Sequence, residues 1–131
     1  MMDPTPSLYE RLGRYDGIAA IVDDLLPRLL QDSDLRVYWK GKCEDSLKKD
    51  RQLIVDFLAS AFGGPVVYLG RSMKMSHQRL GITEREWAIF IEHVGATMRN
   101  LAIRQPEAAE FLAAAESLKA DVVEAAEVVG V

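Results

Sequence analysis

Apolar residues recur at helical spacing along nearly the whole chain, and no segment shows the strict alternation expected of a half-buried strand. Near the N-terminus, Ser7 and Glu10 fit a capping box, which predicts a short helix over residues 8–14. Asp16 and Gly17 then interrupt the pattern. The chain is therefore predicted to be all-α, beginning with a brief helix and a turn.

The strongest apolar stripe follows this turn and predicts a longer second helix. Its members are Ile18, Ile21, Val22, Leu25, Leu26, Leu29 and Leu30. Pro27 lies inside the stripe, where a proline typically costs about 3 kcal/mol and crowds the carbonyl group one turn earlier, that of Asp23. Because the stripe is strong, we retain the helix and expect a bend near residues 23–24, or a break.

The middle of the chain is predicted to hold a turn at residues 32–34, a short aromatic segment at 35–40 and a loop at 41–45. From Ser46 the pattern is again helical, through Leu47, Ile54, Phe57, Leu58, Ala61 and Phe62. The Gly-Gly-Pro sequence at 63–65 should end that helix sharply. A loop at 65–71 with Tyr68 as its apolar anchor should lead into a short helix over 72–79, which Gly81 ends.

Two further helices complete the predicted order. Thr83 and Glu86 form a second capping box, and the helix that follows turns one apolar face inward: Trp87, Phe90, Ile91, Val94, Met98 and Leu101. Pro106 in a first turn opens the last helix. Its inward residues are expected to be Phe111, Leu112, Ala115, Leu118, Val122 and Val123.

The composition indicates one globular domain over residues 1–131, with a flexible segment at 1–6 and fraying over 125–131. Of the 131 residues, 49% are hydrophobic and 27% are charged, which leaves enough apolar material for one core. The net charge of −4 argues against nucleic-acid binding and against attraction to anionic membranes. With one cysteine, Cys43, and neither a secretion signal nor about 18 consecutive apolar residues, we expect a cytoplasmic protein.

Few residues are equipped for chemistry. There are two histidines, His77 and His93, and no phosphate-binding glycine loop. Cys43 lies in a lysine-rich segment that could lower its pKa, although an incidental loop thiol is the commoner explanation. His77 lies among soft apolar residues, which suits a neutral imidazole ligand to a haem iron. By spacing alone, a lone histidine is more often a core or partly exposed residue, so both interpretations stay open.

Several motifs, in order, resemble those of the truncated haemoglobins, most closely their first group. The resemblance covers residues 8–101. Residues 9–18 resemble the family's short first helix and glycine bend, residues 32–39 its aromatic haem-stacking segment, and residues 57–65 the end of its distal helix. The most specific block is Tyr-Leu-Gly-Arg-Ser-Met at 68–73, followed by His77 and residues 80–83, because it carries the proximal histidine in the family.

This resemblance implies a shortened globin, a two-over-two helical sandwich around haem b, with His77 as the proximal ligand to the iron. By position, Trp39 stacks against the haem, and Tyr38 is the alternative if the register slips by one. The other expected apolar contacts are Phe57, Tyr68, Met73, Trp87 and Phe90, each of which plain core packing would also explain. The candidates for pairing with the haem propionates are Arg71, Lys74 and Lys49.

The distal side departs from the family pattern. First-group members usually carry a tyrosine on the second helix and glutamines on the distal helix, which hydrogen-bond bound dioxygen. The matching residues here are Leu26, Asp50 and Ile54. Since the stretch from 39 to 63 is a few residues longer than usual, nearby polar side chains stay candidates for reaching the sixth coordination site: Lys49, Asp50, Arg51 and Gln52. His93 matches a position that does not contact iron, so we expect it to be structural or partly exposed.

The resemblance favours a haem protein that reversibly binds the diatomic gases O2, CO and NO. Leu26 and Ile54 would line an apolar distal wall, which favours fast dioxygen release. A second possibility is a haem enzyme, either a nitric-oxide dioxygenase served by a reductase or a weak peroxidase, but an apolar wall argues against the firmly held dioxygen that a dioxygenase needs. A third is a haem-free globin-like interaction module. The oligomeric state is not defined by the sequence.

Overall fold

A computed structural model describes residues 6–124, and every regular element within them is helical. In chain order these are α1 (Leu8–Arg11), α2 (Arg14–Gln31), the 3-10 helix η1 (Arg36–Trp39), α3 (Glu44–Ala61), α4 (Met73–His77), α5 (Glu84–Asn100), α6 (Gln105–Glu116) and α7 (Lys119–Val122). The expected all-α class is thus confirmed. The expectations for residues 1–5 and 125–131 lie outside the described residues.

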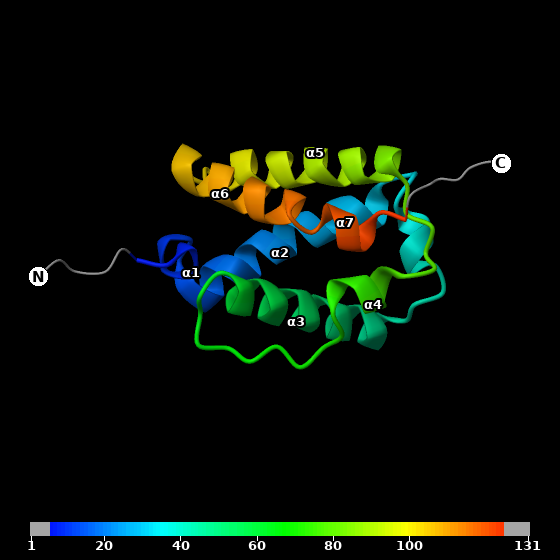
Figure 1. Ribbon diagram of the computed structural model, residues 1–131, viewed down its shortest axis with the longest axis horizontal. Helices are drawn as coiled ribbons and strands as arrows, with labels where there is room; N and C mark the ends of the chain where they lie inside the picture. The colour runs from blue at the N-terminus through cyan, green and yellow to red at the C-terminus, as the bar shows by residue number, and fades with distance from the viewer. Residues whose placement is uncertain (1–5, 125–131) are drawn as a thin grey trace, which may run out of the picture.

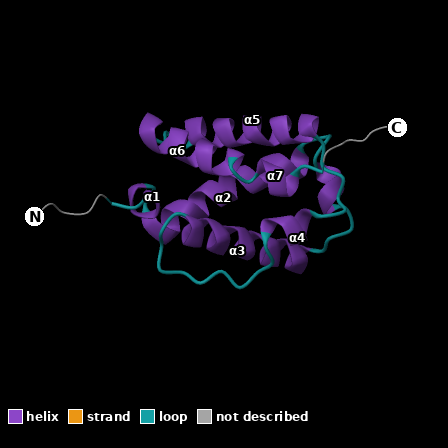
Figure 2. Cartoon of the chain, in the orientation of Figure 1, coloured by secondary structure: helices purple, strands orange, loops and turns teal. Residues whose placement is uncertain are grey.

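The long helices form two layers with α2 between them (Figure 1). On one side α5 packs against α6, and on the other side lie α3 and α4. Helix α2 contacts both α3 and α5, while the short α1 contacts α2 and α6. Within the described residues, the longest connection without helix is the segment 62–72, which passes along the outer side of α3 (Figure 2).

The core is centred on the apolar stripe of α2, as the sequence predicts. Ile18, Ile21 and Val22 are at most 1% exposed. Val55 of α3 and Val94 of α5, the two helices that pack against α2, are also fully buried. Helix α2 continues through Pro27, so the break that we considered does not occur. The Pro27 side chain is exposed, whereas Leu25, Leu26 and Leu29 around it remain buried, so the apolar face of α2 is continuous past the proline.

Both capping boxes form as predicted. The backbone N–H of Glu10 donates to Ser7 Oγ at 3.1 Å, and the Glu10 carboxylate accepts from the Ser7 N–H at 3.2 Å. At the start of α5, Glu86 N–H donates to Thr83 Oγ1 at 3.1 Å and the Glu86 carboxylate accepts from Thr83 N–H at 3.0 Å. Each box satisfies donors that the first turn of a helix leaves without partners.

Several predicted boundaries are wrong, and the backbone gives the reason. The first helix ends at Arg11 rather than Arg14, because Gly13 and Arg14 adopt positive φ angles of 102° and 63°. The turn therefore lies before Arg14, and the expected interruption at Asp16 and Gly17 is wrong, because both residues lie inside α2. The predicted loop at 41–45 is shorter, because α3 already begins at Glu44 with two acidic residues in its first turn, which the helix dipole favours.

The two later boundaries also differ from the sequence pattern. Helix α4 ends at His77, before Gly81, since Gln78 is extended and Arg79 has a φ of 69°. The last predicted helix is two helices, because α6 ends at Glu116 and α7 starts at Lys119. Within residues 6–124, none of the helices is long and apolar enough to cross a membrane.

Two helical glycines offer a matched test of this packing. A Cβ atom on Gly17 would lie 1.9 Å from the Leu12 carbonyl oxygen, whereas one on Gly95 would meet only the flexible end of Arg99 at 3.3 Å. We predict that Gly17→Ala lowers the free energy of unfolding by about 2 kcal/mol or more through this clash. Gly95→Ala should be neutral or should raise it by up to about 1 kcal/mol, since alanine is the better helix former. Urea unfolding of the three proteins measures both; equal effects would show that α1 and α2 do not meet as described.

Candidate functional site

His77 is the last residue of α4, and its imidazole is held in one orientation. Ser72 caps this five-residue helix by accepting a hydrogen bond from Met75 N–H at 3.1 Å. The Nδ1 atom of His77 lies 2.8 Å from the carbonyl oxygen of Met73, one turn earlier. In a neutral imidazole, a ring nitrogen that faces a carbonyl oxygen carries the proton, and the lone pair is then on Nε2. In that tautomer the half-buried His77 side chain offers Nε2 as a ligand for a metal ion.

The surroundings of His77 are apolar but not filled by the core. Helix α4 packs against α7, and none of its five side chains is buried. Met75 is 55% exposed and Leu80 is 44% exposed, whereas Met73 is half-buried. Trp87 on α5 and Val122 on α7 are also buried, but they do not belong to the main core cluster. The segment around His77 therefore has exposed apolar side chains, Met75 and Leu80, against which a flat apolar group could pack.

The aromatic candidates fall into two separate pairs. The rings of Trp87 and Phe90 on α5 are 5.1 Å apart between centroids, and Trp87 Nε1 donates to the Glu116 carboxylate at 2.6 Å. The rings of Phe57 and Tyr68 meet edge to face at 5.3 Å. Tyr68 also donates its hydroxyl proton to the Arg71 carbonyl oxygen at 2.6 Å, so it anchors its loop as predicted.

The neighbours Tyr38 and Trp39 of η1 have different tasks. The Tyr38 hydroxyl donates to Glu86 Oε1 at 2.5 Å, the same oxygen that accepts from the Thr83 N–H. Burial, together with the Glu86 carboxylate, raises the pKa of Tyr38 to about 12. Trp39 is half-buried against the core. Because the polar tip of Tyr38 is committed to α5, Trp39 is the freer of the two aromatic side chains.

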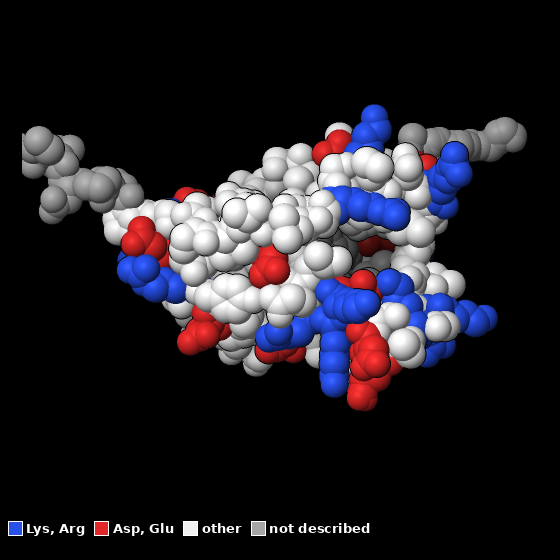
Figure 3. Space-filling model, turned by 90° about the horizontal axis from the view of Figure 1, so that it is seen from below, with Lys and Arg blue, Asp and Glu red and all other residues white. Residues whose placement is uncertain are grey.

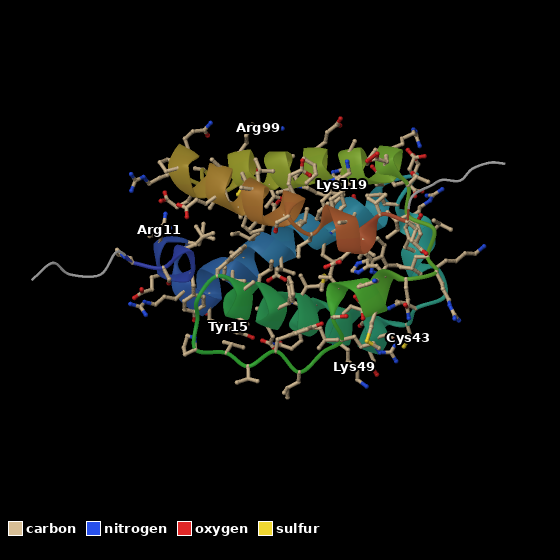
Figure 4. All side chains as sticks on the ribbon, viewed as in Figure 1. Arg11, Tyr15, Cys43, Lys49, Arg99 and Lys119 are labelled. Atoms are coloured by element: carbon tan, nitrogen blue, oxygen red, sulfur yellow. The ribbon has the colours of Figure 1, made fainter. Side chains whose placement is uncertain are left out.

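Most polar residues considered for the distal side are engaged elsewhere. Asp50 accepts from Lys42 Nζ at 2.6 Å, and Arg51 forms two hydrogen bonds with Asp23 at 2.7 and 3.0 Å. Gln52 donates to the Asp56 carboxylate at 3.0 Å. Of the four candidates, the exposed Lys49 is the one for which the described residues show no side-chain partner; Figure 4 places it at the outer edge of α3.

The two apolar distal candidates lie on facing helices. Leu26 is 8% exposed and lines a groove of about 190 Å³ between α2 and α3, together with Pro27, Leu30 and Leu47. Charged side chains complete the lining: Asp23, Glu44, Lys48 and Arg51. Ile54 is half-buried and packs against the core. Neither Leu26 nor Ile54 can donate a hydrogen bond.

His93 and Cys43 have structural surroundings. His93 Nε2 lies 2.7 Å from Asp32 Oδ2, and this bond is the main reason why the pKa of Asp32 is lowered. Its partly exposed side chain agrees with the expectation. Cys43 precedes α3 and is exposed; a hydrogen bond with Ser46, rather than the neighbouring lysines, lowers the pKa of its thiol. Sequence reasoning missed the His93 and Tyr38 contacts because their partners lie 61 and 48 residues away.

The basic residues considered as partners for the propionates point to solvent. The propionate candidates Arg71, Lys74 and Lys49 are all exposed, and no ion pair involves them within the described residues. Figure 3 shows the surface hollowed towards the end where α4 lies, with Lys and Arg side chains gathered along the rim.

Comparison with known proteins gives a consistent result. The family described as "Bacterial-like globin" matches residues 7–124. A group 1 truncated hemoglobin of Mycolicibacterium paratuberculosis is 29% identical over 116 residues, which are 88% of this chain and 83% of that protein. One from Nostoc commune is 33% identical over 92 residues, which are 70% and 75% of the two chains.

Solved structures extend the likeness to the fold. Truncated hemoglobin from Tetrahymena pyriformis in its Fe(III) form superposes with a TM-score of 0.82 at 23% identity, over 90% of this chain and 98% of that one. The 2/2 hemoglobin from Synechococcus sp., solved with covalently attached heme, gives 0.81 at 27% identity over the same shares. The expected two-over-two helical arrangement is thereby confirmed.

The Tyr38–Glu86 contact predicts a late-titrating phenol. A pKa raised in the folded state means that the contact stabilises the fold fully below the ordinary tyrosine pKa of about 10, and that this contribution is lost as the pH rises towards 12. We expect the ultraviolet difference titration between the wild type and Tyr38→Phe to show one phenol ionising near pH 12. If the phenol that is lost in Tyr38→Phe titrates near pH 10 in the wild type instead, Tyr38 points into solvent.

Proposed function

Because the chain belongs to the bacterial-like globin family, whose members bind haem, we propose that His77 is the proximal ligand and that the protein reversibly binds diatomic gases on the opposite haem face. The observation that carries this proposal is the 2.8 Å contact between His77 Nδ1 and the Met73 carbonyl oxygen. Ligating histidines commonly donate their other ring N–H to such a carbonyl, which fixes the tautomer and raises the basicity of the ligating nitrogen.

The chemistry of the residues present fits a haem. Bound haem supplies an iron centre that takes one protein nitrogen and one small gas molecule. Around it, Trp39 and the pairs Trp87–Phe90 and Phe57–Tyr68 would exclude water, and Met73, which lies on the same helix as His77, would pack against the haem. The cations at the rim, Arg71, Lys74 and Lys49, would pair with the propionates.

The distal wall determines how long dioxygen stays. Leu26 and Ile54 offer no proton, and Asp50 and Arg51 are held in ion pairs. A donor to a charged or strongly polar partner contributes roughly 1.5–3 kcal/mol. Without one, dioxygen leaves faster, while carbon monoxide, which is much less polar, is little affected. We therefore propose a gas-binding protein with fast dioxygen release.

Replacing the proposed ligand tests the central claim. His77→Gly should lower haem affinity by more than about tenfold, since even the loss of an outer partner of a metal ligand commonly costs 10- to 100-fold. Free imidazole should restore the wild-type visible spectrum, because it can occupy the vacated space and coordinate in the same way. His93→Gly is the matched control and should leave the spectrum unchanged. If the two variants behave alike, or if only His93→Gly changes the spectrum, the assignment is wrong.

Leu26→Tyr tests the distal wall. The introduced hydroxyl should slow dioxygen dissociation by about ten- to a hundredfold while changing carbon monoxide dissociation little. Flash photolysis and stopped-flow mixing measure the two rates. Leu26→Phe is the control, because it adds a similar aromatic ring without a hydrogen-bond donor. Slow dioxygen release in the wild type would contradict the proposal and would point to Lys49 or the Trp39 indole N–H as the donor.

A further inference from the structure

Positive charge is concentrated in one part of this acidic chain. Residues 40–79 contain eight of the sixteen Lys and Arg residues but only four of the twenty Asp and Glu residues, so the segment carries a net charge of +4. The rest of the chain carries −8, which gives the overall value of −4. A total charge therefore describes this molecule poorly, because the segment 40–79 has the opposite sign to the rest of the chain.

The basic segment is the one that supplies most of the proposed haem surroundings. Lys40 follows Trp39 directly, Lys74 is next to Met73, and Arg79 comes two residues after His77. Lys48 and Lys49 lie in the first half of α3, and Arg71 ends the loop that Tyr68 anchors. Figure 3 shows Lys and Arg side chains, with Asp and Glu side chains among them, at the end of the molecule that holds the hollow.

Most of these cations are available to a partner. Six are exposed: Lys40, Lys48, Lys49, Arg71, Lys74 and Arg79. Within residues 6–124, the ion pairs of the segment are Lys42 with Asp50 and Arg51 with Asp23, which involve none of the six. A haem has two propionates, so even a fully paired haem leaves most of this group in solvent. We call these six residues the basic face.

We propose that the basic face docks an acidic electron-transfer protein that reduces the ferric haem. The proposal rests on the proposed haem function, and the distal wall gives it a reason. A pocket without a hydrogen-bond donor favours loss of an electron to dioxygen, which leaves ferric iron unable to bind it. The basic face would hold the partner, whose reduced iron–sulfur cluster or flavin would supply one electron and be oxidised by one electron, with no bond formed or broken.

The arrangement of charge favours a folded acidic protein over a uniform polyanion. Exposed Glu44 and Asp45 lie within the same region, and red side chains stand among the blue ones in Figure 3. A partner with its own patches can avoid these acids, whereas a nucleic acid or an anionic bilayer would meet both them and the strongly negative remainder of the chain. Complementary patches mainly raise the association rate, and salt screens that effect.

The test uses the haem-loaded full chain and an acidic two-iron ferredoxin as the probe. The variant Lys40→Glu/Lys48→Glu reverses two charges of the basic face that have no proposed haem contact. The matched control, Arg14→Glu/Arg99→Glu, makes the same charge change elsewhere; Figure 4 shows Arg99 on the α5 side, away from Lys49. Binding of oxidised ferredoxin by surface interferometry and reduction by reduced ferredoxin in stopped flow are measured at two salt concentrations.

We expect the face variant to lose about tenfold or more in association and reduction rates at low salt, with the difference disappearing at high salt. The control should resemble the wild type, and the visible spectrum should not change in either. Equal losses in both variants, salt-independent ferredoxin binding, or tighter binding to duplex DNA or phosphatidylserine vesicles would each overturn the proposal. A wild type without a haem spectrum would instead refute the proposed function, while the interferometry would still report on docking.

Discussion

Burial of α2 on several sides determines where the other helices lie. Helices α3 and α5, the short α1 and η1 all contact it, and Ile18, Ile21 and Val22 are almost completely removed from water. Fully burying one such side chain contributes about 1.5–3 kcal/mol. The cost of an interior proline, about 3 kcal/mol, is therefore outweighed by the stripe as a whole, which explains why α2 passes through Pro27 without a break.

Polar contacts then fix the register that burial alone would leave loose. Thr97 of α5 is fully buried, and its hydroxyl donates to Asp24 of α2 at 2.7 Å. Burial by itself raises the pKa of Asp24, but hydrogen bonds from Arg28, Thr97 and Asn100 outweigh it, so the pKa lies below its ordinary value. At the C-cap of α2, the Asp32–His93 bond repeats this connection to α5. Together, the Thr97–Asp24 and Asp32–His93 hydrogen bonds fix the position of η1, and thus of Trp39, relative to α5.

The sequence predicted what depends on neighbours in the chain. The stripe of α2, the two capping boxes and the Ser72–His77 helix were readable because their determining residues lie within a few positions of one another. The ends of helices were less readable, since the end of α1 depends on positive φ angles at Gly13 and Arg14. On the distal side, the pairing of Asp50 with Lys42 and of Arg51 with Asp23 depends on how α3 crosses α2 and on its approach from η1. Such choices between polar partners have no signal in the spacing of apolar residues.

The proposed cofactor would complete a fold that the polypeptide leaves open at one place. A helix of five residues is too short to be stable by itself, and α4 buries none of its side chains. Its described supports are the Ser72 cap and contact with α7, which is one residue shorter. Apolar area removed from water contributes about 25 cal/mol per Å², so a haem set against Met73 and its neighbours would add the burial that α4 lacks. The same contact would keep His77 Nε2 directed at the iron. Packing of the haem against α4 would therefore both order this short helix and orient its ligand.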